Sequence, residues 1–329
     1  MAVAEGGLPG SPRFAALDAA RGIALAAMVV FHGAFDLDSL GLAALGVDRS
    51  PGWRGFAVLI ASSFLFLSGM SLVIAHGKGI RRDAFFRRLA ILVGSAALVT
   101  LGTWYVMPRE FIFFGILHSI AVASLIGLAF LRAPWPVTLI AAILVLIAPH
   151  RVAAPIFEAS PLRFLGLGTN VPTTLDFEPV FPWLAPFLAG MAATRLALPS
   201  FARGTLAGWR PLAWPARALA WAGRHSLAIY LIHQPLMFGT LALLAQSLAG
   251  GASFSAEDRP FIEACRETCV SRGGEKPACD SYCGCTADEL KKAGLWASVL
   301  ADRLTPQERQ RLAEVMQACA RARPAGTVP

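Results

Sequence analysis

Charged residues are scarce in this chain. Of its 329 residues only 15% are Asp, Glu, Lys or Arg, whereas 56% are hydrophobic, and the mean hydropathy is +0.58. A soluble domain carries about 25% charged residues. The composition therefore excludes an ordinary soluble enzyme, because so much apolar surface cannot all be buried in a domain of this size. The same figures exclude a disordered or collagen-like chain.

The common catalytic and nucleotide-binding motifs are also missing. The sequence contains no Walker loop, no dinucleotide glycine fingerprint, no GxSxG and no HExxH. The formal net charge of +8 would indicate nucleic acid if the basic residues formed a phosphate-binding stripe. Most of them are instead arginines between apolar runs, a distribution typical of membrane topology signals. We therefore expect a lipid bilayer, and no nucleic acid, among the partners.

Seven apolar runs are candidates for crossing a bilayer, which takes about 17–25 residues, and the short fifth run is kept because a bilayer can thin around a short span. They cover approximately residues 16–37, 56–76, 89–107, 111–131, 137–149, 180–196 and 226–249. The fifth run is the shortest and follows two prolines. Small residues around Gly69 and Gly190 predict close helix packing. The predicted fold class is all-α: a polytopic bundle of about seven transmembrane helices, with a small Cys-rich helical module at the C-terminus. The bundle is expected to occupy residues 1–250.

Positive charge is concentrated in the connections on one side of this bundle. These residues are Arg13, Lys78, Arg81, Arg82, Arg87, Arg88, Arg132, Arg195, Arg203, Arg210, Arg217 and Arg224. The positive-inside rule then predicts a cytoplasmic N-terminus and an external C-terminus. The first 15 residues lack the features of a signal peptide, so the first run is expected to be an uncleaved helix. The predicted location is a bacterial inner membrane, with a periplasmic C-terminus.

Cysteine is absent from the first 264 residues, and all six cysteines lie in the tail. They are Cys265, Cys269, Cys279, Cys283, Cys285 and Cys319. Disulfides form in oxidising compartments, which agrees with an exported C-terminus. Residues 251–329 are therefore predicted to be a periplasmic tail of short helices. Its helix-capping signals stand at Ser255, Thr286 and Thr305.

The spacing of the cysteines favours one pairing. Two Cys-x3-Cys pairs place their sulfurs on one face of each of two helices. A hairpin of these helices can be joined outer to outer and inner to inner. The resulting pairs are Cys265–Cys283 and Cys269–Cys279, with Cys285–Cys319 left over. Six cysteines allow 15 connectivities, so this is a geometric preference. Zinc is the alternative, but the tail has no His and no CxxC spacing, and no metal is expected.

Ionisable residues within the apolar runs mark candidate functional sites, because they are costly in a membrane. His32 and Asp36 are one helical turn apart near the outer end of the first run. Asp36 can orient His32 as a general base. Alternatively, the two side chains only hydrogen-bond to each other at the end of the helix and have a structural role. Asp18 and Arg21 can pair at the other end, as part of a site or as an anchor. The remaining candidates are His118 on the outer half, Asp176, Glu178 and Trp183 at the outer side before the sixth run, and His233 and Gln234 at about the middle of the membrane.

Five segments resemble, in order, the transmembrane acyltransferases related to heparan-alpha-glucosaminide N-acetyltransferase. The segments are residues 13–36, 64–72, 114–121, 176–183 and 223–235. The resemblance covers about residues 13–240. It implies acetyl-CoA as a donor that enters from the cytoplasmic side. It also implies a polar acceptor outside, often a sugar, and an essential histidine, which we carry over to His32.

Together the residues and the resemblance predict a mechanism. His32, oriented by Asp36, deprotonates the acceptor, and His118 or a helix dipole stabilises the oxyanion. The CoA phosphates are bound by Arg21, Arg81, Arg82, Arg87 and Arg88, unless these arginines only set the topology. The acceptor is bound by Asp176, Glu178, Trp183, His233 and Gln234. Direct transfer and an acetyl-His32 intermediate both stay open.

Two other classes of function are compatible with the residues. A small-molecule or proton-coupled transporter would use the intramembrane His and Asp residues as a proton relay, although no internal repeat is evident. A non-catalytic scaffold that presents the tail would not need His32, Asp36 and His118 within the membrane. The sequence also leaves open whether the chain forms a homodimer.

Overall fold

The computed structural model describes residues 14–77, 79–201, 209, 211–248, 258–301 and 303–321. Throughout these ranges the regular secondary structure is helical, apart from one isolated bridge between Phe114 and Phe177. The chain divides into two compact units, residues 1–241 and 242–329, and each is described by itself. The predicted fold class, an all-α membrane bundle with a Cys-rich helical module, is confirmed.

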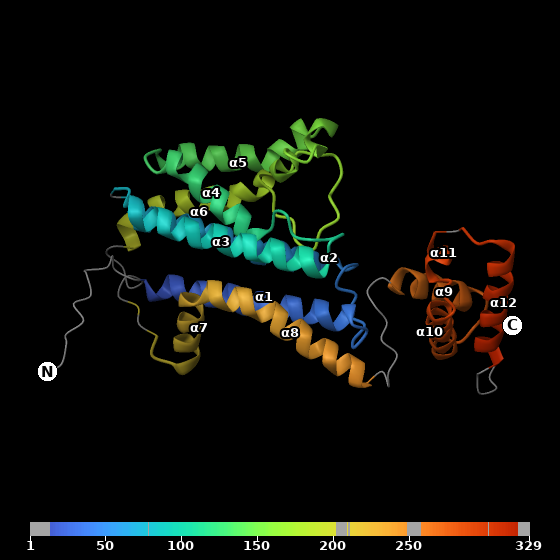
Figure 1. Cartoon of the computed structure of the whole chain (residues 1–329). Helices are drawn as coiled ribbons and strands as arrows, with labels where there is room; N and C mark the ends of the chain where they lie inside the picture. Colours follow the sequence, from blue (N-terminus) through green and yellow to red (C-terminus); the bar gives the residue numbers. More distant parts are fainter. Residues whose placement is uncertain are drawn as a thin grey trace. The chain divides into compact units, whose positions relative to one another are not determined.

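Eight helices form the bundle in the described ranges (Figure 1). They are α1 (Ala15–Ser39), α2 (Pro51–His76), α3 (Arg82–Val106), α4 (Ile116–Phe130), α5 (Trp135–Val152), α6 (Val180–Phe201), α7 (Trp214–Arg224) and α8 (Ser226–Leu248). Six of them, α1, α2, α3, α5, α6 and α8, are long and apolar enough to cross a membrane, and α4 is a shorter apolar helix. The fifth predicted run is thus a full-length helix of 18 residues, whereas the fourth is the short one.

Helix α6 lies at the centre of the main core. Phe187, Leu188 and Met191 are fully buried on it, in a cluster with residues of α2, α3, α4 and α5. Gly69 of α2 abuts the backbone of Phe187, and Gly190 of α6 abuts the backbone of Phe66. These contacts confirm the predicted close packing at both glycines, since only a residue without Cβ lets two backbones approach so closely.

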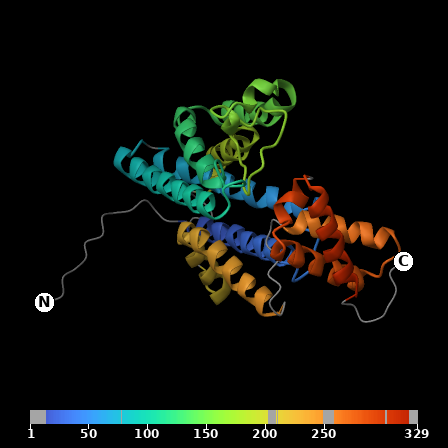
Figure 2. The ribbon, with the colours of Figure 1, turned by 45° about the vertical axis from the view of Figure 1, so that its right-hand side comes forward.

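Helices α1, α2, α7 and α8 share a second, smaller core, and Figure 2 shows the ribbons of α7 and α8 beside that of α1. Leu25 and Met28 of α1 pack there against Ile60 of α2, with side chains of α7 and α8 around them. Gly22 of α1 meets the backbone of Leu219 in α7, so the two helices are in direct contact. The bundle thereby holds the polar residues of α1 next to α8.

Some predicted basic loop residues lie in a helix instead. Helix α3 begins at Arg82 and has Asp83 in its first turn, where a carboxylate stabilises the N-terminus of a helix. Arg82, Arg87 and Arg88 are therefore in its first two turns rather than in a connection. Four other residues of the predicted basic connections lie outside the described residues; they are Arg13, Lys78, Arg203 and Arg210.

Residues 111–115, predicted to begin the fourth span, are not helical, and α4 starts only at Ile116. The backbone groups of this segment bond to the connection before α6. Leu175 N donates to Glu110 O at 2.9 Å, and Glu178 N donates to Phe114 O at 3.1 Å. Two short 3-10 helices, η1 (Pro155–Glu158) and η2 (Arg163–Leu165), precede this part of the connection. The pairing brings Asp176 and Glu178 to the N-terminus of α4.

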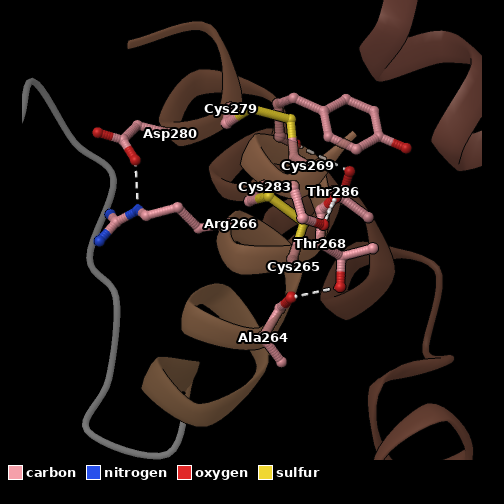
Figure 3. Close-up of a disulfide and its surroundings, with 11 residues drawn as sticks. Ala264, Cys265, Arg266, Thr268, Cys269, Cys279, Asp280, Cys283 and Thr286 are labelled. Carbon is pink, nitrogen blue, oxygen red and sulfur yellow. Dashed lines mark hydrogen bonds and ion pairs between the residues drawn. A yellow bond between two sulfur atoms is a disulfide. The ribbon is translucent and has the colours of Figure 1, made fainter. Parts of the chain in front are cut away.

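The second unit contains α9 (Arg259–Ser271), α10 (Lys276–Lys292), α11 (Trp296–Leu300) and α12 (Pro306–Arg321). Helices α9 and α10 form a hairpin that Figure 3 shows with two parallel disulfides across it. The pairs are Cys265–Cys283 and Cys269–Cys279, and Cys285–Cys319 joins α10 to α12. This pairing is the one that the outer-to-outer and inner-to-inner arrangement predicts. An ion pair between Arg266 and Asp280 also links the two hairpin helices.

The capping signals of this unit have different outcomes. Thr305 and Glu308 form the predicted capping box, because Glu308 N donates to Thr305 Oγ1 at 3.2 Å and Thr305 N donates to Glu308 Oε2 at 2.8 Å. Thr286 does not cap a helix. It lies within α10, which already begins at Lys276, and its hydroxyl donates to Tyr282 O. Ser255 lies outside the described residues.

Candidate functional site

Asp36 of α1 is bonded to α8. It is 1% exposed, and its Oδ1 accepts a hydrogen bond of 2.9 Å from Gln234 Nε2. The expected bond to His32 is not formed: Asp36 Oδ2 has no hydrogen-bond partner in the described part of the chain. A carboxylate buried between two helices is satisfied by the amide donor that faces it, and this donor comes from α8. Asp36 therefore does not orient His32 in this structure.

The neighbour of His32 is instead His233 of α8. The centroids of the two imidazole rings lie 5.2 Å apart, with the ring planes at 58°. Nδ1 of His233 lies 2.7 Å from the carbonyl oxygen of Tyr230, so this nitrogen carries the proton. His233 Nε2 is then the deprotonated nitrogen, and it is buried without a partner. The structure thus brings two of the predicted histidines together.

Asp176 and Glu178 lie on the other side of the same site. Oδ2 of Asp176 accepts from the backbone N–H of Ile116 at 3.2 Å, at the N-terminus of α4. Its charge acts on both His32 and Tyr230. Burial, together with the neighbouring Asp176 carboxylate, raises the pKa of Glu178 well above its ordinary value. Both effects favour the protonated form of Glu178.

His118 is held in a hydrogen-bond chain of its own. Its Nδ1 accepts from the backbone N–H of Gly115 at 3.3 Å, and its Nε2 lies 3.2 Å from Thr100 Oγ1. Thr100 donates in turn to Ile112 O at 2.7 Å. Because both ring nitrogens are bonded, His118 fixes the turn at Gly115, and neither nitrogen is directed at His32. The sequence predicted His118 about two turns inside its helix, whereas the structure has it in the first turn of α4 and in this chain of bonds.

Unpartnered polar atoms are concentrated around His32. Of the buried side-chain atoms without a hydrogen bond in the bundle's described residues, all four belong to this group: Asp36 Oδ2, Glu178 Oε2, His233 Nε2 and Gln234 Oε1. Leaving such an atom unsatisfied costs about 1–3 kcal/mol. Since natural proteins seldom retain this cost without a reason, the cluster is the candidate functional site.

A second polar group lies at the opposite end of α1. Arg21 bonds to Asp18 at 3.2 Å, as the sequence predicts, and also donates to Ser71 of α2. Arg88 of α3 is close enough to Arg21 for the two positive charges to repel. The positive charges of Arg88 and Arg81 both act on His76. The structure therefore gathers three of the five predicted arginines.

Some predicted residues are not brought together. Arg82 and Arg87 make no described contact with the group around Arg21, although they are exposed on α3 just as Arg88 is. Trp183 packs against the hydrophobic core at the start of α6. Tyr230 and His76 are additions that the sequence reasoning missed. Tyr230 stands one helical turn before His233, and this spacing was the available signal.

These features define a class: an α-helical, multi-pass membrane protein with a polar site within the membrane bundle. A comparison with known families matches residues 13–235 to the catalytic domain of heparan-alpha-glucosaminide N-acetyltransferase. The match covers more than half of the chain, and the chain belongs to this family of membrane acetyltransferases. Comparisons with curated proteins and with solved structures give no match. Among the described residues no group of three or more His, Cys, Asp or Glu could hold a metal ion.

Proposed function

We propose that the protein transfers an acetyl group from cytoplasmic acetyl-CoA to a polar acceptor on the outer side of a bacterial inner membrane. The observation that carries this proposal is the cluster of unpartnered polar atoms around His32. An acyl transfer needs a base next to a space that the two substrates share. The family match supports acetyl transfer as the reaction, and the cluster supports the region around His32 as the place where it occurs.

His32 is the proposed general base. It takes the proton of an acceptor hydroxyl or amine as the acceptor oxygen or nitrogen bonds to the thioester carbon. The carbon–sulfur bond then breaks, and the CoA thiolate leaves and is protonated. His118 contributes by fixing the turn at Gly115 through its two bonds. Asp176 contributes by tying the outer connection to α4. An acetyl-His32 intermediate is the alternative route. The imidazole first displaces CoA from the acetyl group, and the acceptor then displaces the imidazole.

The CoA phosphates are proposed to bind the basic group at the opposite end of α1. Arg21, Arg81 and Arg88 supply the positive charge there, and guanidinium groups recognise phosphate through paired hydrogen bonds. Arg21 and His32 are 11 residues apart on one helix, which corresponds to about 16 Å along the axis. An extended pantetheine arm spans this separation, so phosphates at Arg21 place the thioester near His32.

The proposed topology follows from the polar residues at the two ends of α1. The arginine-rich end faces the cytoplasm, where acetyl-CoA is made, and the end with Asp176 and Glu178 faces outward. Residues 1–250 then form the acyltransferase bundle. Residues 251–329 form a periplasmic tail, and their three disulfides are compatible with an oxidising compartment.

The test is a thermal-shift titration of the purified full chain with acetyl-CoA. A ligand that binds only the folded state stabilises it by about 2.7 kcal/mol at 100 times its Kd. We expect acetyl-CoA to raise the melting temperature more than dephospho-CoA and ATP do. Arg88→Ala should reduce the shift, whereas Arg82→Ala, its matched control on α3, should not. Both arginines are exposed, but only Arg88 lies near Arg21. No shift at millimolar acetyl-CoA with a folded protein would contradict the proposal and favour solute transport.

A further inference from the structure

We propose that the four unpartnered atoms around His32 form the acceptor subsite. We further propose that this subsite selects a molecule with several O–H or N–H donors and no negative charge near the reacting group. This inference rests on the proposed acetyl transfer for the identity of the reaction. The argument for the subsite itself depends only on the hydrogen-bonding character of the four atoms.

Two of the atoms are acceptors because of what their side chains already donate. Gln234 must direct its amide nitrogen to the Asp36 carboxylate, since two oxygens cannot hydrogen-bond without a proton between them. Its Oε1 is therefore left over, and it can only accept. The imidazole of His233 donates from Nδ1 to the carbonyl of Tyr230. In the neutral ring, Nε2 is then an acceptor as well.

The other two atoms are carboxyl oxygens. Asp36 has one oxygen on Gln234, and its Oδ2 is unpartnered although the residue is 1% exposed. Glu178 neighbours Asp176, and its Oε2 is the unpartnered atom. A carboxyl oxygen of this kind accepts hydrogen bonds. All four atoms thus require a donor.

The acceptors lie together, and no cation of the protein satisfies them. The Asp36–Gln234 bond and the contact of His233 with His32 join α1 to α8. The Asp176 charge acts on His32 from the outer connection. Within the described ranges, no guanidinium or ammonium group bonds or pairs with Asp36, Glu178 or Gln234. A donor-rich ligand completes such a site, and an anionic ligand is repelled by its carboxylates.

The experiment measures CoA release by the full chain with four matched probes. They are methyl glucoside, methyl glucosaminide, methyl glucuronide and glucose 6-phosphate. We expect the two probes without negative charge to have kcat/KM at least about 10-fold above the two anionic ones, because an unmatched buried polar group strongly penalises the wrong substrate. Removing single hydroxyl groups from the better probe should lower kcat/KM by about 2- to 10-fold each.

Two isosteric variants test the residues. Asp36→Asn and Glu178→Gln each replace a carboxyl group by an amide that can donate. Both variants should reduce the ratio of kcat/KM for methyl glucoside to kcat/KM for methyl glucuronide. Glu158→Gln is the matched control, because Glu158 is an outer-connection carboxylate already bonded by Thr169 and Asn170. The two test residues lie on different elements, so misfolding of one variant leaves the other informative.

Binding of the four probes without acetyl-CoA, followed by thermal shift, separates this inference from the proposed function. If acetyl-CoA neither binds nor is cleaved, the proposed function fails, and the binding preference still decides the subsite. Equal or better binding or transfer with the anionic probes would overturn the subsite and leave the acetyl transfer standing. Neither binding nor transfer with any probe would also overturn the subsite.

Discussion

Gln234 donates to Asp36 across a separation of 198 residues in the sequence, and the bond is 2.9 Å long. It connects the first and the last membrane helices of the bundle directly beside His32 and His233. Asp36 is 1% exposed, so the burial of its carboxylate depends on the hydrogen bond from the Gln234 amide. The bond therefore ties the stability of the α1–α8 contact to the site itself.

Gln234→Leu should destabilise the bundle. The substitution leaves the Asp36 carboxylate buried with neither oxygen bonded, at a cost of about 1–3 kcal/mol or more for a charged group. Urea unfolding in detergent measures the loss. Thr240→Val is the control on the same helix, because the Thr240 hydroxyl bonds only to carbonyls of its own α8. Equal stability of the two variants would mean that Asp36 does not depend on Gln234.

His32→Ala should lower the rate of acetyl transfer by about 10²–10⁴, the usual contribution of a general base. The thiol of released CoA reports the rate, and an unchanged melting temperature shows that the variant folds. His225→Ala serves for comparison, since His225 is exposed and its Nδ1 bonds to Trp221 O. A His32 variant that retained most of the activity would remove this residue from the mechanism.

Gly69→Ala should destabilise the packing of α2 against α6. A Cβ at Gly69 would collide with the backbone carbonyl of Phe187, and overpacking of this kind costs about 1–3 kcal/mol. Gly102→Ala is the matched change on α3, where a Cβ would meet nothing within 4 Å. In thermal unfolding, Gly69→Ala should have a lower melting temperature than the parent protein, and Gly102→Ala a melting temperature equal to or above it. The reverse order would contradict the packing described.

The disulfides Cys285–Cys319 and Cys269–Cys279 should differ in how much they stabilise the tail. The two cysteines of Cys285–Cys319 are 34 residues apart in the sequence, and those of Cys269–Cys279 are 10 residues apart. Loop-closure entropy assigns them about 4 and about 3 kcal/mol, respectively. Replacing the first pair by serines should therefore make the tail of the full chain more sensitive to protease than replacing the second. Equal digestion rates would show that loop length does not determine their effect.

The pKa of Glu178 predicts a pH dependence of stability. Burial and Asp176 raise this pKa well above its ordinary value of 4.5. Above pH 4.5 the unfolded chain has lost a proton that the folded chain retains. Stability should therefore fall as the pH rises from about 4.5 to the raised pKa. Glu178→Gln removes the titration, so its melting temperature should fall less over this range; parallel curves would argue against the raised pKa.

Features that depend on local spacing could be read from the sequence. Apolar length predicts the spanning helices, and the two Cys-x3-Cys pairs predict a helical hairpin joined by two bridges. The Asp18–Arg21 pair is three residues apart on one helix and is formed. In each case the interacting groups lie on one helix or on two consecutive ones, so the helical period is sufficient to place them.

Features that depend on packing could not be read in this way. The apolar run 111–114 fits a helix equally well, but its backbone bonds to residues 174–178 and to two threonines of α3 instead. Asp36 has His32 one turn away, yet a donor from α8 binds it. Local spacing identifies the side chains that can meet within a helix, whereas the tertiary fold decides which contact forms.

One side of the site is formed by connecting chain, since residues 110–114 pair with residues 175–178. Connections accept replacement more readily than packed helices do. Under the proposed function, acceptor choice can therefore diverge during evolution by changes in these two short segments, while the arginines at the other end remain as they are. Relatives that share the bundle would then use one donor and many acceptors, and exchanging the two segments between relatives would transfer the preference.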